Sequence, residues 1–177
     1  MSKYNIAVVV GSLRRDSFNR KLATGVAKLA PSDFLFKQLE IGVLPLYNQD
    51  DDGNQAEPVK RLKAEIASAQ GLLFVTAEYN RSIPGVLKNA IDHASRPYGQ
   101  SAWAGKPAGV LGASVGTVGT AVAQQHCAPS SPTSTFRRSA SPKHSSMRRT
   151  ISSTKPVTSV PAVRSFCRPG WTDMSPG

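Results

Sequence analysis

The chain has 177 residues, of which 22 are Lys or Arg and 11 are Asp or Glu, so its formal net charge is +11 at pH 7. Most of this excess lies in residues 127–177, which carry eight basic side chains against one acidic, whereas residues 1–126 carry 14 against 10. Because the basic part has few apolar residues and residues 1–126 hold no nucleic-acid-binding motif, we expect no nucleic-acid partner.

Cysteine positions and the first apolar run exclude further classes of protein. Both cysteines, Cys127 and Cys167, fall in the basic part, so residues 1–126 can hold neither a disulfide nor a cysteine-based metal site. The apolar run near the N-terminus is too short to span a membrane and lacks the basic segment and cleavage site of a signal peptide. We therefore expect a cytoplasmic protein without membrane contact.

The first half of residues 1–126 predicts two strands with one helix between them. Residues 4–10 form a short β-branched apolar run, which predicts a buried strand. Residues 19–30 carry apolar side chains at spacings of three and four, which predict an amphipathic helix ending before Pro31. Residues 34–39 predict a second strand. In the irregular stretch that follows, residues 42–54, an acidic run is most simply a solvated loop, with a metal site as the alternative.

The second half repeats the alternation of helix and strand. Residues 57–70 carry apolar side chains on one helical face, and the apolar run Gly71–Thr76 (GLLFVT) predicts a buried strand. Pro84 suits the first turn of a third helix. Residues 108–114 predict a fourth strand, and residues 119–126 the start of a fourth helix.

Strands that alternate with helices imply an α/β fold, in which helices cover both faces of a parallel sheet through right-handed crossovers. In such sheets, ligands bind beyond the C-terminal ends of the strands, where the strand order reverses. The loops that follow the strands are therefore the candidate binding segments.

The loop after the first strand, GSLRRDSFNRKL at residues 11–22, predicts a phosphate site. Hydroxyls, an amide and an arginine precede the helix N-terminus, namely Ser12, Arg14, Ser17 and Asn19. Free N–H groups and the helix dipole attract an anion there, and an arginine fork suits a phosphate. Capping of the helix by Ser17 or Asn19 is the alternative. The absence of GxxxxGK[ST] and GxGxxG motifs argues against NTP hydrolysis and a conventional dinucleotide fold.

Two further loops follow the third and fourth strands. Glu78-Tyr79-Asn80 place an aromatic ring and an amide where they could stack on and hydrogen-bond to a planar heterocycle, although an ordinary strand-to-helix turn explains them equally well. Residues 114–119 (SVGTVG) include small residues that let the backbone approach a ligand closely.

Together these loops resemble the NADPH-dependent FMN reductase family, in particular its quinone and chromate reductase branch. The resemblance covers residues 1–126 nearly continuously, and it is carried by GSLRRDSFN at 11–19, EYNRSIPGVLKNAID at 78–92, SRPYGQSAWAGKP at 95–107 and the Ser114-x-Gly116 turn. It implies a flavodoxin-like three-layer α/β/α fold with a parallel sheet of order 2-1-3-4, a fifth strand being missing. It also implies non-covalent FMN and a homo-oligomer, dimer or tetramer.

The resemblance further implies which residues contact the flavin. Ala77 stands where the family usually has proline, which loosens the loop without removing a ligand atom. The residues matched to the FMN phosphate are Ser12, Arg14, Ser17 and Asn19. The residues matched to the isoalloxazine are Glu78, Tyr79, Asn80 and Arg81 on one side, and Ser114 and Gly116 on the other.

The implied reaction is a ping-pong transfer, in which NADPH or NADH gives hydride to the flavin and a quinone, chromate or free flavin then accepts the electrons. Since the cofactor supplies the chemistry, we expect no catalytic acid, base or nucleophile and no metal. We expect His93 on the surface of its helix. Two alternatives are a flavodoxin-like electron carrier and a non-catalytic product of a reductase gene.

The resemblance stops after His126. In residues 127–177, 25 residues are Ser, Thr or Pro, which predicts a disordered basic tail after an incomplete FMN-binding domain at residues 1–126. A shifted reading frame would explain this break. With one cytidine restored, permitted codons for residues 127–137 (CAPSSPTSTFR) can be read as LRTLLAYLDVP, a helical pattern followed by the start of a strand. A naturally disordered tail is the alternative.

Overall fold

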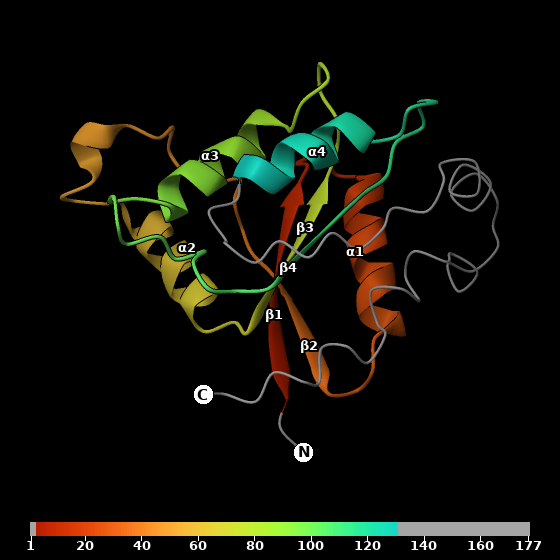
Figure 1. The fold of residues 1–177 in the computed structure, drawn as a ribbon, viewed down its shortest axis with the longest axis horizontal. Coiled ribbons are helices and arrows are strands. Elements are labelled where there is room, and N and C mark those ends of the chain that lie inside the picture. Colours follow the sequence, from red (N-terminus) through yellow and green to blue (C-terminus); the bar gives the residue numbers. More distant parts are fainter. Residues whose placement is uncertain (1–2, 131–177) are drawn as a thin grey trace.

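A four-stranded parallel sheet lies at the centre of the computed structural model, which describes residues 3–130 (Figure 1). The strand order β2-β1-β3-β4 confirms the predicted α/β, flavodoxin-like arrangement. The order reverses between β1 and β3, because the chain first moves outward to β2 and then returns to the other side of β1. The strands are β1 (Tyr4–Gly11), β2 (Phe34–Gln38), β3 (Gly71–Thr76) and β4 (Ala108–Gly112).

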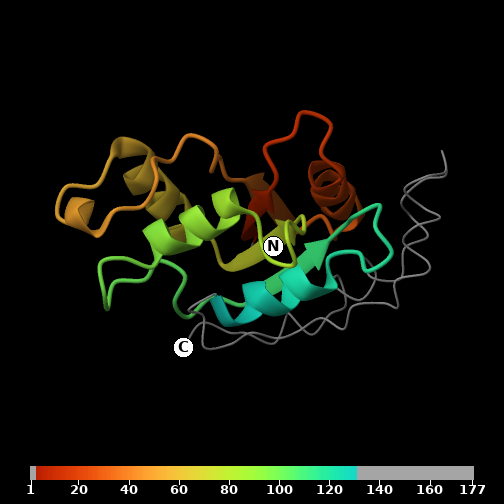
Figure 2. The same ribbon diagram turned by 90° about the horizontal axis from the view of Figure 1, so that it is seen from above.

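The helices cover the sheet on both faces (Figure 2). On one face α1 packs against alternate residues of β1 and β3, and on the other face α2, α3 and α4 enclose the larger core cluster. None of the helices in the described part of the chain is long and apolar enough to cross a membrane. The helices are α1 (Phe18–Leu29), α2 (Glu57–Ala67), α3 (Gly85–Ala94) and α4 (Ala121–Ser130), with a short 3-10 turn, η1 (Gln49–Asp51).

Strand register brings the ends of three strands side by side. Gly11 of β1 pairs with Thr76 of β3, and Thr76 pairs with Gly112 of β4. A Cβ at Gly112 would lie 2.1 Å from Thr120 Oγ1 and 2.5 Å from the Thr76 carbonyl oxygen, so the end of β4 accepts no side chain. The loops that follow β1, β3 and β4 therefore begin at one edge of the sheet.

Strand β4 ends at Gly112, whereas the sequence predicted a strand to residue 114. The reason is that the next residue, Ala113, takes its hydrogen bonds from a side chain: its N–H donates to Asn19 Oδ1 over 2.8 Å, and its carbonyl accepts from Asn19 Nδ2 over 3.0 Å. The other strand and helix limits differ from the prediction by three residues or fewer.

The prediction that His93 lies on the helix surface is wrong. His93 is only 4% exposed, because the segment after β2 folds over α3. Its Nε2 lies 2.9 Å from the Pro45 carbonyl oxygen, and the Tyr47 ring meets the imidazole edge-on at 5.3 Å. The nearby acidic run forms η1, and within residues 3–130 no group of three or more His, Cys, Asp or Glu side chains could hold a metal ion.

Helix α4 continues past the predicted domain boundary at residue 126 and ends at Ser130. The Cys127 side chain is fully buried, and this burial raises the pKa of its thiol to about 12. The remaining part of the predicted tail, and with it most of the frameshift hypothesis, lies outside the described residues.

Cys127 is expected to resist alkylation in the native protein. The thiolate is the reactive form, so a raised pKa and a covered sulfur should slow reaction with iodoacetamide at pH 8 by about 1,000-fold relative to the protein in urea. Mass spectrometry of the peptide that contains Cys127 measures this. Equal rates in the two conditions would show that α4 does not pack on the sheet at this point.

Candidate functional site

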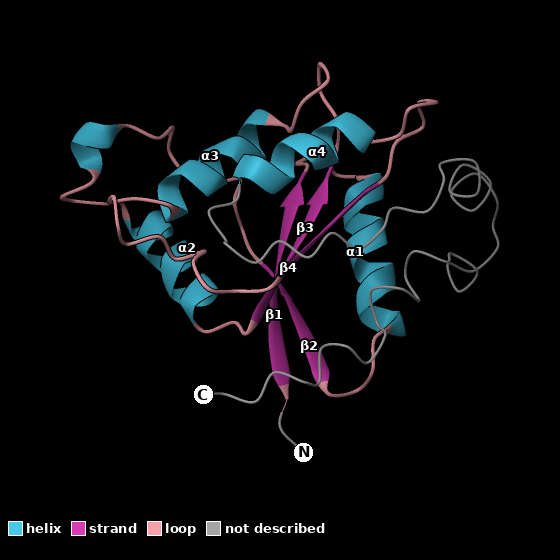
Figure 3. Ribbon diagram, viewed as in Figure 1, coloured by secondary structure: helices cyan, strands magenta, loops and turns pink. Residues whose placement is uncertain are grey.

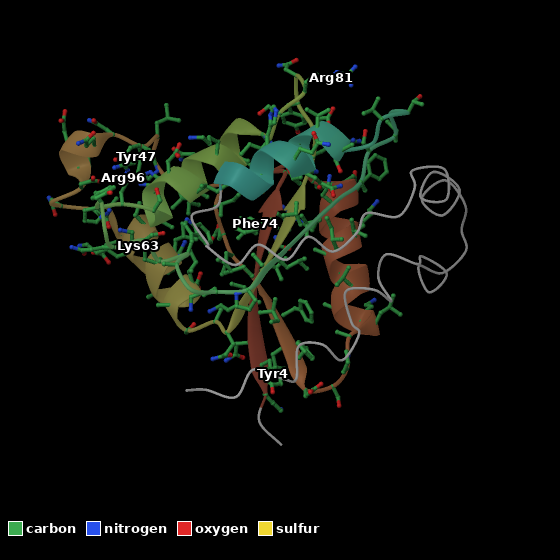
Figure 4. All side chains as sticks on the ribbon, viewed as in Figure 1. Tyr4, Tyr47, Lys63, Phe74, Arg81 and Arg96 are labelled. Carbon is green, nitrogen blue, oxygen red and sulfur yellow. The ribbon has the colours of Figure 1, made fainter. Side chains whose placement is uncertain are left out.

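The predicted ligand residues lie in the three loops at the C-terminal edge of the sheet, except Asn19, which is the second residue of α1. Figure 3 shows these loops above the arrowheads of the strands, and Figure 4 places Arg81 at the tip of the loop after β3. The strand pairings of Gly11, Thr76 and Gly112 bring the loops together. The structure thus gathers at one edge three segments that are far apart in the sequence.

In the first loop, two hydroxyls lie below the surface at the start of α1. Ser12 and Ser17 are both buried, and Ser17 Oγ accepts a hydrogen bond from the Arg20 N–H over 3.3 Å. Ser17 therefore caps α1, as the alternative interpretation of this loop expected. A capping hydroxyl accepts with its oxygen and keeps its own hydrogen, so Ser17 can still donate to an anion at the helix N-terminus.

Arg14 is one of two exposed arginines in this loop, with Arg15 beside it. The Arg14 guanidinium lies 5.7 Å from the centre of the Phe18 ring, on the first residue of α1. No carboxylate within residues 3–130 pairs with it, so none of these residues' carboxylates occupies its fork of donors. Buried hydroxyls, a helix N-terminus and an unpaired guanidinium together form a donor set that fits a phosphate group.

Asn19 lies beside these donors, but its side chain is engaged elsewhere. The residue is 3% exposed, and its amide forms both hydrogen bonds with the Ala113 backbone. It does not cap α1, because Ser17 occupies that position. The sequence analysis did not predict this pairing, and the sequence carries no local signal for it, because the two residues are 94 positions apart.

In the second loop, the Glu78 carboxylate caps α4. Its Oε2 accepts from the N–H groups of Val122 and Ala123, each over 3.1 Å, and the Glu78 side chain is 9% exposed. Its Oε1 lies 3.7 Å from Arg81 Nη1. A carboxylate at a helix N-terminus is favourable because it meets both free N–H groups and the positive end of the dipole. Glu78 thus joins the second loop to the end of the third.

Beyond Glu78 the chain makes a tight two-residue turn. Tyr79 and Ser82 exchange backbone hydrogen bonds, both of 3.0 Å, and the two residues between them, Asn80 and Arg81, have φ angles of 51° and 63°. Asparagine tolerates this left-handed conformation, whereas for arginine it is uncommon and costs about 1–3 kcal/mol. The turn leaves Tyr79 54% exposed at the sheet edge, where its ring can stack on a planar ligand.

The third loop turns sharply after β4. Ser114 Oγ accepts from the Gly116 N–H over 3.0 Å, and Thr120 packs beneath Gly112 at the end of the loop. Exposed apolar side chains are frequent in the three loops, which suits a flat apolar ligand. They are Leu13, Tyr79, Val115 and Val118.

Comparison with known proteins identifies the family. The family model described as NADPH-dependent FMN reductase matches residues 4–132. The chain is 64% identical over 121 residues to a 2-hydroxy-1,4-benzoquinone reductase of Burkholderia sp., which is 68% of this chain and 66% of the relative. It is 56% identical over 117 residues to a quinone reductase of Pseudomonas putida, which is 66% of this chain and 63% of the relative.

A solved structure shares both the fold and a large part of the sequence. It is the flavoenzyme NAD(P)H:(acceptor) oxidoreductase FerB from Paracoccus denitrificans, with a TM-score of 0.72 and 47% identity over 76% of this chain and 75% of that one. The chain spans just under two thirds of the length of the first curated relatives that it matches.

Proposed function

This chain belongs to the NADPH-dependent FMN reductase family, and from that premise we propose that the sheet edge binds FMN non-covalently and passes electrons from NADPH or NADH to a small-molecule acceptor. The observation that carries the proposal is the phosphate-type donor set at the start of α1, which lies at the same sheet edge as the exposed Tyr79. Bound FMN would supply the two-electron chemistry.

The chain's own residues would bind and orient the cofactor. Ser12, Ser17 and Arg14 would hold the phosphate at the N-terminus of α1, by hydrogen bonds and charge. The turn at Asn80 and Arg81 and the backbone around Ser114 and Gly116 would border the ring system, with Tyr79 stacked against it. Asn19 and Glu78 belong to the same set, but their side-chain oxygens already accept hydrogen bonds within the protein.

We propose a quinone as the acceptor, because two of the relatives are named as reductases of quinones. Chromate and free flavin are the competing acceptors. The test loads the protein with FMN and follows NADPH oxidation by absorbance, with and without a benzoquinone, chromate or added FMN. Quinone-dependent turnover supports the proposal. Flavin that NADPH cannot reduce would favour the electron-carrier alternative, and a protein that binds no FMN would favour the non-catalytic one.

Removing the Arg14 guanidinium is expected to weaken FMN binding by about 1.5–3 kcal/mol, the range for a hydrogen bond to a charged group. Fluorescence quenching of FMN during titration measures the affinity of Arg14→Ala, both in this chain and in a version with the reading frame restored. Arg15→Ala is the matched control, because Arg15 is exposed in the same loop and is not among the predicted ligands. Equal affinities for the two variants would mean that the loop does not select a phosphate.

Ser17 separates the capping role from the phosphate role. Ser17→Ala is expected to weaken FMN binding by about 0.5–1.5 kcal/mol as a neutral donor. Ser17→Asp retains a cap for α1 but places a negative charge beside the phosphate, so it should weaken FMN binding more than Ser17→Ala while unfolding at a similar temperature. Tighter FMN binding by Ser17→Asp than by Ser17→Ala would show that Ser17 only caps the helix.

We propose that residues 1–126 form an FMN-binding domain without its last elements, and that the codons after residue 126 are read in a shifted frame. The matched segment is 68% of this chain and 66% of the Burkholderia relative, so the two chains have nearly the same length and the match leaves out about a third of each. The nucleotide sequence around codon 127 tests this. An alternative frame without a helix-strand-helix pattern would contradict the proposal.

We also propose that the frame-restored protein is a cytoplasmic homo-oligomer, a dimer or tetramer. The family resemblance supports this proposal, as do two strongly exposed apolar side chains, Leu46 and Tyr98. Light scattering after gel filtration measures the oligomeric state, and a monomer would contradict it.

A further inference from the structure

The connection between β4 and α4, residues 113–120, is held at both ends by two side chains, one from the first turn of α1 and one from the second loop. At its start, the Asn19 amide pairs with both backbone groups of Ala113, over 2.8 and 3.0 Å. Just beyond its end, the Glu78 carboxylate accepts from the N–H groups of Val122 and Ala123, each over 3.1 Å. Asn19 thus ties the third loop to the first turn of α1, directly after the first loop, and Glu78 ties it to the second loop.

The Asn19 tie is buried, which makes it specific. Ala113 lies immediately after β4, so its N–H and carbonyl have no strand partner, and the Asn19 amide matches both groups at once. If the amide were removed, a buried donor and a buried acceptor would be left unpaired. Without the amide, the third loop would therefore have to move away from α1 so that water could reach these two groups.

The Glu78 tie rests on charge as well as on hydrogen bonds. Two free N–H groups in the first turn of α4 and the positive end of the helix dipole both favour a carboxylate at this point. The same side chain lies directly before the turn that presents Tyr79. The position of α4 and the position of this turn are thereby coupled through one residue.

We propose that Asn19 and Glu78 are positioning residues for the flavin site, which set the distance of the Ser114-Val115-Gly116 backbone from the phosphate loop and from the Tyr79 turn. This inference rests on the proposed function, because it concerns the same site. It assigns the two side chains a role through the third loop instead of a direct contact with FMN. The four variants Asn19→Ala, Asn19→Asp, Glu78→Ala and Glu78→Gln separate these roles.

Hydrogen exchange in the FMN-free chain tests whether the ties exist. Glu78→Ala should speed exchange of the Val122 and Ala123 amides at least about tenfold, whereas Glu78→Gln keeps an acceptor oxygen and should stay within about threefold of the unsubstituted chain. Asn19→Ala should speed exchange of the Ala113 amide by a similar factor. Asn19→Asp keeps the acceptor for this amide and should protect it better than Asn19→Ala.

Glu57→Gln is the control for the loss of a carboxylate. Glu57 lies in the first turn of α2, exposed and paired with Lys60 over 2.8 Å, and has no link to the three loops. It should change exchange at none of the three amides. The melting temperature of each variant, followed by circular dichroism, identifies any that fail to fold. Where an alanine variant fails to fold, the near-isosteric variant at the same position, Glu78→Gln or Asn19→Asp, is compared with the unsubstituted chain in its place.

FMN binding tests whether the ties serve the site. Affinity should fall about tenfold in Glu78→Ala and Asn19→Ala, should be restored to within about threefold in Glu78→Gln, and the visible circular dichroism of bound FMN should change in both alanine variants. Faster exchange with unchanged affinity and spectrum would overturn the positioning role and leave the proposed function intact. Unchanged exchange would show that the ties do not exist. If neither the unsubstituted chain nor its frame-restored version binds FMN, the proposed function and the positioning role are overturned together.

Discussion

Replacing Trp103 with alanine is expected to lower the free energy of unfolding by about 3–5 kcal/mol, one of the two largest effects that we predict for this chain. Trp103 is fully buried, its ring centre lies 5.5 Å from that of Phe74 in β3, and its indole N–H donates to the Ile91 carbonyl over 3.1 Å. The substitution removes this contact, leaves a cavity between β3 and α3, and removes the donor to a buried carbonyl.

Urea unfolding followed by circular dichroism measures the effect. Trp103→Phe is the matched control: it keeps an aromatic ring against Phe74 and loses mainly the hydrogen bond, so its cost should be smaller, about 1–2 kcal/mol. If Trp103→Ala and Trp103→Phe lower the free energy of unfolding equally, the cavity is not the main cause of the loss. A loss below about 1 kcal/mol for Trp103→Ala would contradict the packing of Trp103 against Phe74 described above.

Restoring the reading frame after residue 126 is expected to raise the free energy of unfolding by about 5 kcal/mol or more, a change comparable to the whole net stability of a small domain. Within residues 3–130, β4 pairs with β3 alone and is an edge strand, and α1 is the helix that packs on its face of the sheet. A further strand and helices would pair this edge and cover more of the apolar face.

The frame-restored protein should therefore bind FMN and catalyse NADPH-dependent quinone reduction, whereas the present chain should bind FMN weakly, aggregate through the β4 edge and show little activity. Urea unfolding, FMN titration and light scattering compare the two proteins at equal concentration. Equal stability, affinity and activity would show that the present C-terminal residues do not impair the enzyme. This outcome would contradict the functional consequences that we expect from a shifted frame.

The elements of this fold could be predicted because their signals are local. The uninterrupted apolar run GLLFVT became β3, buried along its whole length, and the apolar spacing in residues 19–30 became α1. The strand order was implied by the family resemblance, and the structure confirms it. Alternating strands and helices also placed the candidate loops correctly at one edge, because successive parallel strands end on the same side of a sheet.

Side-chain partners at the site could not be predicted in the same way. The sequence offered phosphate binding or helix capping for Asn19, and neither alternative included its pairing with Ala113, 94 residues away. The family resemblance implied a place for Glu78 beside the flavin ring, and no local signal predicted that its carboxylate caps α4, 44 residues further along the chain. His93 was expected at the surface and is buried beneath the segment that contains Pro45.

By itself, therefore, the sequence determined the types and order of the elements, the family and the three loops of the candidate site. Only the tertiary structure decided which atoms of those loops remain available to a ligand and which are already bonded to the protein. The physical reason is that Asn19 and Glu78 reach their partners only after β1, β3 and β4 align in one register. That alignment depends on packing across the whole sheet, which a local segment of sequence does not contain.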